Sequence, residues 1–299
     1  MIGYLNGRGA ADSAPVIAAF REGLKEAGFV DGQNVVIESR FAEGQYERLP
    51  ALAAELVARK VNVFVATGGT ASVLKARPIV PETTPIVFVM GGDPVKLGVV
   101  ASLARPGGNI TGVTFLVNQL GSKSISLLHE MLPKVTLIGF LLNPEDPNAQ
   151  SDLRDAQEAA SKLKLKLVPV KARSGGELEA AFASLAKQKV GALFVATDPL
   201  FAFHKPALIQ LATRHAIPAI YGLREFATAG GLMTYGTSIT DANRQLGVYT
   251  GRVLKGTKPA DLPVMQSMRF ELIVNRKTAD ALKLAIPQTI LLQATEVLE

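Results

Sequence analysis

The 299-residue chain contains no cysteine and no tryptophan, and it has only three histidines. Without cysteine it can form neither disulfides nor thiolate metal sites, and it has no cysteine nucleophile. His129, His204 and His215 fall on expected helices, without paired carboxylates or metal-ligand spacing. No apolar run reaches the roughly 18 residues of a membrane-spanning helix. The sequence therefore predicts no metal and no cofactor.

Charge is also sparse and evenly spread. Hydrophobic residues make up 48% of the chain and charged residues 19%, with a formal net charge of +6. The densest basic stretch, residues 162–166, alternates lysine with leucine, and no basic cluster is interleaved with aromatic residues. Nucleic-acid binding is therefore not expected. The composition is that of a globular protein, and the length suits two domains.

Apolar runs alternate with helical periodicity in two successive series. The first predicts strands at 2–6, 35–41, 61–66 and 85–90 and helices at 14–27 and 46–59, with Ser13 as an N-cap. After a glycine-rich break at 107–115, the second predicts helices at 120–132, 149–163, 178–186 and 206–215 and strands at 137–143, 166–170, 192–197 and 219–221. A strand at 230–236, a helix at 240–254, a strand at 270–275 and a partly helical tail at 286–299 follow. The expected fold class is α/β, with two Rossmann-like parallel-sheet lobes.

The turn at residues 67–70 is the strongest local motif. Thr67, Gly68, Gly69 and Thr70 follow a short apolar strand, and Thr70 or a neighbour is expected to cap the next helix. Such a turn presents backbone N–H groups that suit a carboxylate or a phosphate. The alternative is an ordinary strand-to-helix turn in which the glycines only provide tightness.

Three other strands end in a short polar side chain. Asp93 follows Met90 and Gly91, while Asn143 and Asp198 each directly precede a proline. Because ligands of open parallel sheets bind outside the carboxyl ends of the strands, these side chains are expected at a ligand cleft. The alternative for each aspartate is helix capping.

The order of several motifs is similar to that of a known family. They include Asp93-Pro94-Val95, the stretch 105–113, Asn143-Pro144, Thr197-Asp198-Pro199, and the stretches 258–264 and 270–275. Together they resemble the periplasmic substrate-binding proteins of ABC importers, in the branch of uncharacterised transport proteins whose better-known members bind tryptophan.

That resemblance implies a type I periplasmic binding protein fold, in which three hinge crossings join the two lobes. The expected first lobe spans 1–115 plus about 231–263, and the second spans 116–230 plus about 264–299. The resemblance also implies a periplasmic location after removal of a signal peptide, since the first strand starts directly after Met1. The alternative is a cytoplasmic protein that begins at this methionine.

An amino-acid ligand would need three kinds of partner. We expect the 67–70 turn to bind its carboxylate, and Asp93 or Asp198 to bind its ammonium group. The remaining expected contacts are Asn6, Met90, Gly91, Phe115, Asn143, Tyr221 and Tyr235. For the tyrosines the alternative is a place in the strand core.

The predicted function is therefore capture of a small amino-acid-like ligand, aromatic or large and apolar, by closure of the two lobes. The expected partners are this ligand and the permease subunits of an ABC importer, and the expected state is a monomer without catalytic residues. One alternative is a ligand-sensing regulatory domain of the same fold. Another is an amidohydrolase that uses Thr67 or Thr70.

Overall fold

The computed structural model describes residues 1–115 and 118–299. The chain forms two compact units. The first unit comprises Met1–Leu116 and Ile239–Met268, and the second comprises Val117–Ser238 and Arg269–Glu299, so the chain passes between them three times. The strand expected at 230–236 belongs to the second unit, because it pairs with strands of that unit's sheet. The return to the first unit therefore comes at Ile239, later than the expected position near 231.

The first unit is built on a six-stranded sheet in the order β11-β5-β4-β3-β1-β2, whose strand pairs are all parallel. Its elements are β1 (Ile2–Asn6), α1 (Ala10–Glu26), β2 (Ile37–Phe41), η1 (Tyr46–Arg48), α2 (Leu49–Ala58), β3 (Val63–Thr67), α3 (Thr70–Ala76), β4 (Ile86–Met90), β5 (Ile110–Thr114), α10 (Ile239–Leu254), η3 (Pro259–Asp261) and β11 (Met265–Gln266).

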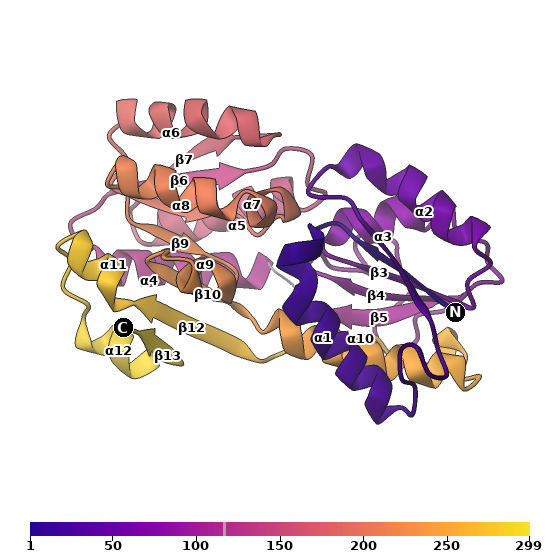
Figure 1. Ribbon diagram of the computed structural model, residues 1–299. Helices are drawn as coiled ribbons and strands as arrows, with labels where there is room; N and C mark the ends of the chain where they lie inside the picture. Colours follow the sequence, from indigo (N-terminus) through magenta and orange to yellow (C-terminus); the bar gives the residue numbers. More distant parts are fainter. Residues whose placement is uncertain (116–117) are drawn as a thin grey trace. The chain divides into compact units, whose positions relative to one another are not determined.

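Helices cover both faces of this sheet. The core on one face includes Phe20 of α1 and Leu246 of α10. The core on the other face includes Leu56 of α2 and Val73 of α3. The two helices α1 and α10 lie side by side although some 200 residues separate them in sequence (Figure 1). Helix α10, which comes late in the sequence, therefore completes the helical layer that α1 begins on this face of the sheet.

The second unit is built on a seven-stranded sheet in the order β13-β12-β10-β9-β8-β6-β7. All its strand pairs are parallel except β10 with β12. Its elements are α4 (Asn118–Met131), β6 (Leu137–Leu142), α5 (Ala149–Lys162), β7 (Lys166–Lys171), η2 (Gly175–Glu177), α6 (Leu178–Lys187), β8 (Ala192–Val195), α7 (Pro199–Phe203), α8 (Lys205–Arg214), β9 (Ala219–Tyr221), α9 (Arg224–Thr228), β10 (Met233–Thr237), β12 (Phe270–Asn275), α11 (Arg276–Ala281), α12 (Gln288–Gln293) and β13 (Glu296–Leu298).

The two faces of this sheet differ in how closely their helices pack on it, as two neighbouring residues of β6 show. On one face α4 and α5 pack together, and Phe140 points between them. On the other face Leu185 of α6 packs so closely on Gly139 that a side chain there would collide with it. Successive strand residues point to opposite faces, which places Gly139 and Phe140 on different sides. The α4 and α5 face therefore has room beside its aromatic residues.

The capping prediction for Ser13 was wrong, whereas the second helix is capped by the neighbour of Thr70. Helix α1 begins at Ala10 with Gly9 as its N-cap, and the hydroxyl of Ser13 donates to the Gly9 carbonyl at 2.7 Å. Helix α3 has Gly69 as its N-cap without a side-chain cap, while Thr70 Oγ1 accepts a bond from the Gly92 N–H at 3.0 Å. In both places a glycine supplies the non-helical backbone at the start of the helix, in place of Ser13 for α1 and as the neighbour of Thr70 for α3. The tail also differs, since it ends in a short strand, β13, after α12.

Candidate functional site

In the first unit, the carboxyl ends of β1 and β3 bring the predicted turn beside Asn6. Asn6 and Thr67 are register partners in neighbouring parallel strands. Gly68 has φ +75° and Gly69 has φ +127°, values that favour glycine. A side chain at Gly68 would collide with the Asn6 carboxamide. The backbone of the turn therefore lies directly against the Asn6 side chain.

Buried hydrogen-bond donors gather at this edge. The Asn6 side chain is fully buried, and its Oδ1 accepts a bond from the Arg8 N–H at 2.9 Å. Its Nδ2 and the Ser72 hydroxyl have no hydrogen-bond partner within the described part of the chain. The Thr67 hydroxyl donates to the amide oxygen Oδ1 of Asn243 at 3.4 Å. A buried amide N–H without a partner is unfavourable, and a ligand carboxylate would supply the missing acceptor.

The other predicted residues of the first unit have structural roles. Met90 is fully buried in the core on the α2 and α3 face, and Gly91 is buried beside it. Phe115 packs against the core on the opposite face. Asp93 Oδ1 accepts the backbone N–H groups of Val95 at 3.0 Å and Lys96 at 3.2 Å. Asp93 thus caps the turn after β4, and its contact with a ligand remains a prediction.

In the second unit, Asn143 and Asp198 lie together after β6 and β8. Asn143 Nδ2 donates to Asp198 Oδ1 at 3.4 Å, and the same Oδ1 accepts the Leu200 N–H at 2.7 Å. Asp198 is therefore the N-cap of α7, and helix capping is the role expected as the alternative for this residue. The structure brings the two predicted side chains together, and their role in binding remains a prediction.

The two predicted tyrosines of this unit are in different places. Tyr221 is 1% exposed and stacks on Phe226 with ring centroids 4.5 Å apart, so it lies in the core as the alternative expected. Tyr235 is partly exposed and stacks on Phe270 with centroids 6.1 Å apart. Of these two tyrosines, Tyr235 lines the cavity described next.

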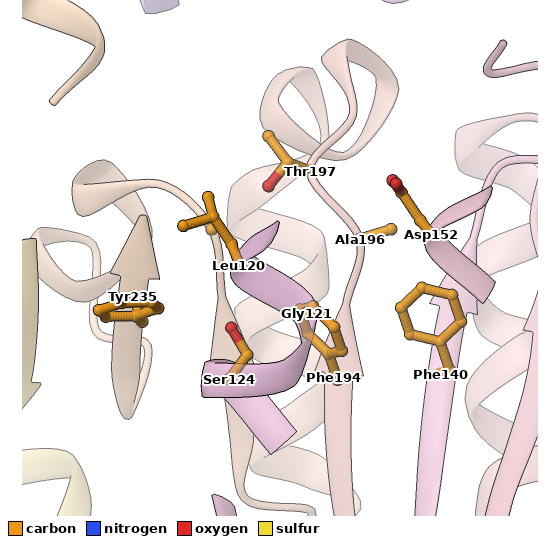
Figure 2. A pocket seen from close by; sticks show the side chains of 10 residues that line it. Leu120, Gly121, Ser124, Phe140, Asp152, Phe194, Ala196, Thr197 and Tyr235 are labelled. Carbon is orange, nitrogen blue, oxygen red and sulfur yellow. The ribbon is translucent and has the colours of Figure 1, made fainter. Parts of the chain in front are cut away.

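This cavity lies between α4, α5 and the sheet and opens to solvent; about 20 Å³ of it is available to the centre of a water molecule, and the whole space, open solvent included, is about 360 Å³. Its walls are mainly apolar and aromatic, and Figure 2 shows their arrangement. The lining residues are Leu120, Gly121, Ser124, Phe140, Asp152, Phe194, Ala196, Thr197, Gly222 and Tyr235. Phe140 and Phe194 are register partners on β6 and β8, and their ring centroids are 5.1 Å apart. The space is thus a slot with aromatic walls at the carboxyl ends of the strands.

One carboxylate enters the slot. Asp152, in the first turn of α5, lies in Figure 2 towards the Thr197 end of the slot. Its Oδ1 is buried and has no hydrogen-bond partner among the residues that the structure describes. Burial, with smaller contributions from the charges of Asp155 and Asp198, raises the pKa of Asp152 to about 7. The nearby Asp146 also has a pKa well above its usual range, chiefly because of burial and then because of Asp198.

Such a carboxylate is destabilising unless a cation or donor joins it. Among the residues that the structure describes, no three His, Cys, Asp or Glu side chains are placed to bind a metal ion. An organic ammonium group is the cation that suits a single carboxylate beside aromatic rings. The chemistry of the slot lining therefore suits an aromatic or large apolar group next to an ammonium group.

Of the ten residues that line the slot, Tyr235 alone was a predicted contact, and the other nine were not predicted from the sequence. Phe140 and Phe194 are mid-strand residues, whose pattern is that of ordinary core. Asp152 is an acidic residue in the first turn of a helix, a position where the helix dipole favours acidic residues whether or not they bind a ligand. Ser124 is one of several serines in α4, and nothing in the sequence distinguishes it. The nearest predicted residues were Asn143 and Asp198, which follow two neighbouring strands of the same sheet.

The chain is similar to known proteins over most of its length. The family model described as ABC transporter substrate binding protein matches residues 13–298. The tyrosine-binding protein of Clostridioides difficile (strain R20291) is 26% identical over 263 residues, which cover 88% of this chain and 75% of that protein. A conserved domain protein from Vibrio cholerae has a similar structure, with a TM-score of 0.90, 25% identity and coverage of 99% and 98% of the two chains.

A further structure, an ABC domain from Streptococcus pneumoniae in complex with L-Trp, matches with a TM-score of 0.89 at 24% identity over the whole of both chains. The fold is that of type I periplasmic binding proteins, with two units built on mainly parallel sheets. The chain belongs to the family of ABC transporter substrate-binding proteins. Over the described residues, no helix combines the length and apolar character needed to cross a membrane.

Proposed function

We propose that this chain is the extracytoplasmic solute-binding component of an ABC importer and that it binds an amino acid with an aromatic or large apolar side chain. The observation that carries the proposal is the slot of the second unit, where an unpaired carboxylate stands among aromatic rings. Membership of the substrate-binding family supports it, as do the tyrosine-binding and L-Trp-bound relatives.

In this proposal each part of the ligand has a partner. Phe140, Phe194 and Tyr235 surround the side chain, and Asp152 binds the ammonium group. Asn6 Nδ2 and the Ser72 hydroxyl are the donors for the carboxylate, with the 67–70 turn beside them. That one ligand contacts both units, and that the units close on it, remain predictions. Delivery to permease subunits, a periplasmic location and the lack of catalysis also belong to the proposal.

A calorimetric and thermal-shift screen of L-amino acids tests the proposal. A ligand that binds only the folded state adds about 4 kcal/mol of stability at a thousandfold excess over its dissociation constant. We expect stabilisation by aromatic amino acids with one ligand per chain. Because the protein has no tryptophan, the fluorescence of bound L-tryptophan can be followed without background. Stabilisation by sugars, with no response to any amino acid, would contradict the proposal.

Two substitutions, one in each unit, test whether a single ligand uses both sites. Ser72→Ala removes an unpaired donor of the first unit, and Asp152→Asn removes the carboxylate of the second. Both variants are expected to weaken binding of the same amino acid by tenfold or more, on the order of 1–3 kcal/mol per lost partner. An effect confined to one unit would show that the other site is not used.

A further inference from the structure

Ser124 is an unusual helical serine because its hydroxyl lacks the local partner that such serines normally have. Serine and threonine inside a helix commonly donate to the carbonyl one turn earlier. Ser126 on the same helix does so to the Ser122 carbonyl at 3.0 Å, and Thr250 of α10 does so to the Leu246 carbonyl at 2.8 Å. The Ser124 side chain is 1% exposed, and its Oγ has no partner within the described residues.

The position of Ser124 in the slot shows what could supply that partner. Ser124 lines the same slot as Asp152, and Figure 2 places it at the level of the Phe194 ring. Asp152 lies towards the Thr197 end in the same view. A ligand whose ammonium group is at Asp152 would therefore direct its side chain along the aromatic walls towards Ser124. The end of that side chain is the part that would contact the hydroxyl.

We propose that Ser124 determines specificity by selecting a ligand whose aromatic ring carries a hydrogen-bonding group, a phenolic hydroxyl or an indole N–H. The inference rests on the proposed function and deepens it. A serine hydroxyl can both donate and accept, so it suits either group. A ring without a polar group would fill the same space but would leave the buried hydroxyl unpaired. Sites built to bond a polar substituent discriminate strongly against the analogue that lacks it.

The test is the ratio of two affinities. Calorimetric titration of the full chain with L-tyrosine, L-tryptophan and L-phenylalanine gives the preference of the unmodified protein. We expect at least one of the first two to bind about tenfold or more tightly than L-phenylalanine. In Ser124→Ala this ratio should fall to within about threefold, mainly through weaker binding of the preferred ligand. Ser126→Ala is the matched control, because it removes a hydroxyl of the same helix that is already bonded, and its ratio should not change.

A second variant separates loss of the hydrogen bond from a change in packing or stability. Ser124→Cys keeps a side chain of similar size but offers only a weak hydrogen bond, so it should lose the preference as well. A change in stability alone would alter all three affinities together and leave the ratio intact. A ratio that persists in both Ser124 variants, or equal affinities in the unmodified protein, overturns the role of Ser124 while leaving aromatic amino-acid binding in place. If no aromatic amino acid binds, the proposed function fails and this inference fails with it.

Discussion

At the scale of one residue, the burial of the Asp152 carboxyl group reduces the stability of the folded protein. Its pKa is about 7 in the folded protein and 3.8 in the reference state. Between these values the folded protein binds the proton more tightly than the unfolded chain does. The contribution of this carboxyl group to stability therefore falls as the pH rises from about 4 to 7, and it is fully unfavourable above pH 7.

We expect Asp152→Asn to stabilise the ligand-free protein at pH 8 by about 1–3 kcal/mol and to have little effect at pH 4. Asparagine removes the charge that burial penalises, and at pH 4 the native carboxyl group is already protonated. Denaturant unfolding at the two pH values measures the difference. Asp280→Asn, an exposed site on α11, is the control and should show no such pH-dependent gain. Equal effects of Asp152→Asn at both pH values would contradict the assignment.

The same residue predicts how ligand binding depends on pH. Three acidic side chains surround Asp152, namely Asp146, Asp155 and Asp198, and the other slot-lining residues carry no charge. A ligand ammonium group prefers the ionised carboxylate, so binding should weaken below the pKa. Relative to pH 8, we expect affinity to be about tenfold lower at pH 6 and about a hundredfold lower at pH 5. Titrations in buffers of different ionisation enthalpy should show proton release at pH 6, which Asp152→Asn should abolish.

At the scale of the helix, two glycines show opposite consequences of the same substitution. Gly23 of α1 faces α10, where an added Cβ would collide with the Arg244 carbonyl. Gly121 of α4 faces the slot, where an added Cβ would lie 3.9 Å from the Phe194 ring, an ordinary contact distance. The first glycine permits two backbones to meet, and the second leaves space that the protein does not fill.

We therefore expect Gly23→Ala to destabilise the protein by about 2–4 kcal/mol, since two packed helices must separate. Glu22→Ala, at the exposed neighbouring position, should change stability by no more than about 0.5 kcal/mol. Chemical denaturation of both variants measures the contrast. If Gly23→Ala kept its full stability, α1 and α10 would be able to move apart with little change in the free energy of unfolding.

Gly121→Ala is expected to act in the other direction. Alanine is better than glycine inside a helix by about 0.5–1 kcal/mol, and here it meets no obstacle. The variant should therefore be more stable than the natural chain yet bind an aromatic amino acid less tightly, because the methyl group narrows the slot. Thermal unfolding and calorimetric titration of one preparation give both values, and tighter binding would exclude Gly121 from the wall of the site.

Local sequence patterns predicted the elements better than they predicted the site. The strand before the 67–70 turn and the polar ends of β6 and β8 could be placed because buried strands and their exits have short-range signatures. The partner of β10 could not, because strand pairing is decided by distant residues. Phe140 and Phe194 likewise look like core in sequence, and only the small residues of α4 packed above them leave the slot open.

At the scale of the whole molecule, neither unit is a continuous piece of chain. The sheet of the first unit needs α10 for one of its faces, where Leu246 and Val253 join the core of β1 and β3. A fusion of residues 1–115 through a flexible linker to residues 239–268 should therefore unfold cooperatively as one unit. Residues 1–115 alone should lack a cooperative transition. Circular dichroism during urea titration distinguishes the two, and cooperative unfolding of the shorter piece would show that α10 is dispensable.

Because α10 lies late in the sequence, the ribosome synthesises it long after the earlier strands and helices of the first unit. Some 125 residues separate the end of β5 from the start of α10, which corresponds to about 6–25 seconds of synthesis at 5–20 residues per second. Throughout that interval the nascent first unit has a nearly complete parallel sheet with one apolar face only half covered. During translation this half-covered apolar face is open to aggregation or to a chaperone until the helix that covers it has been synthesised.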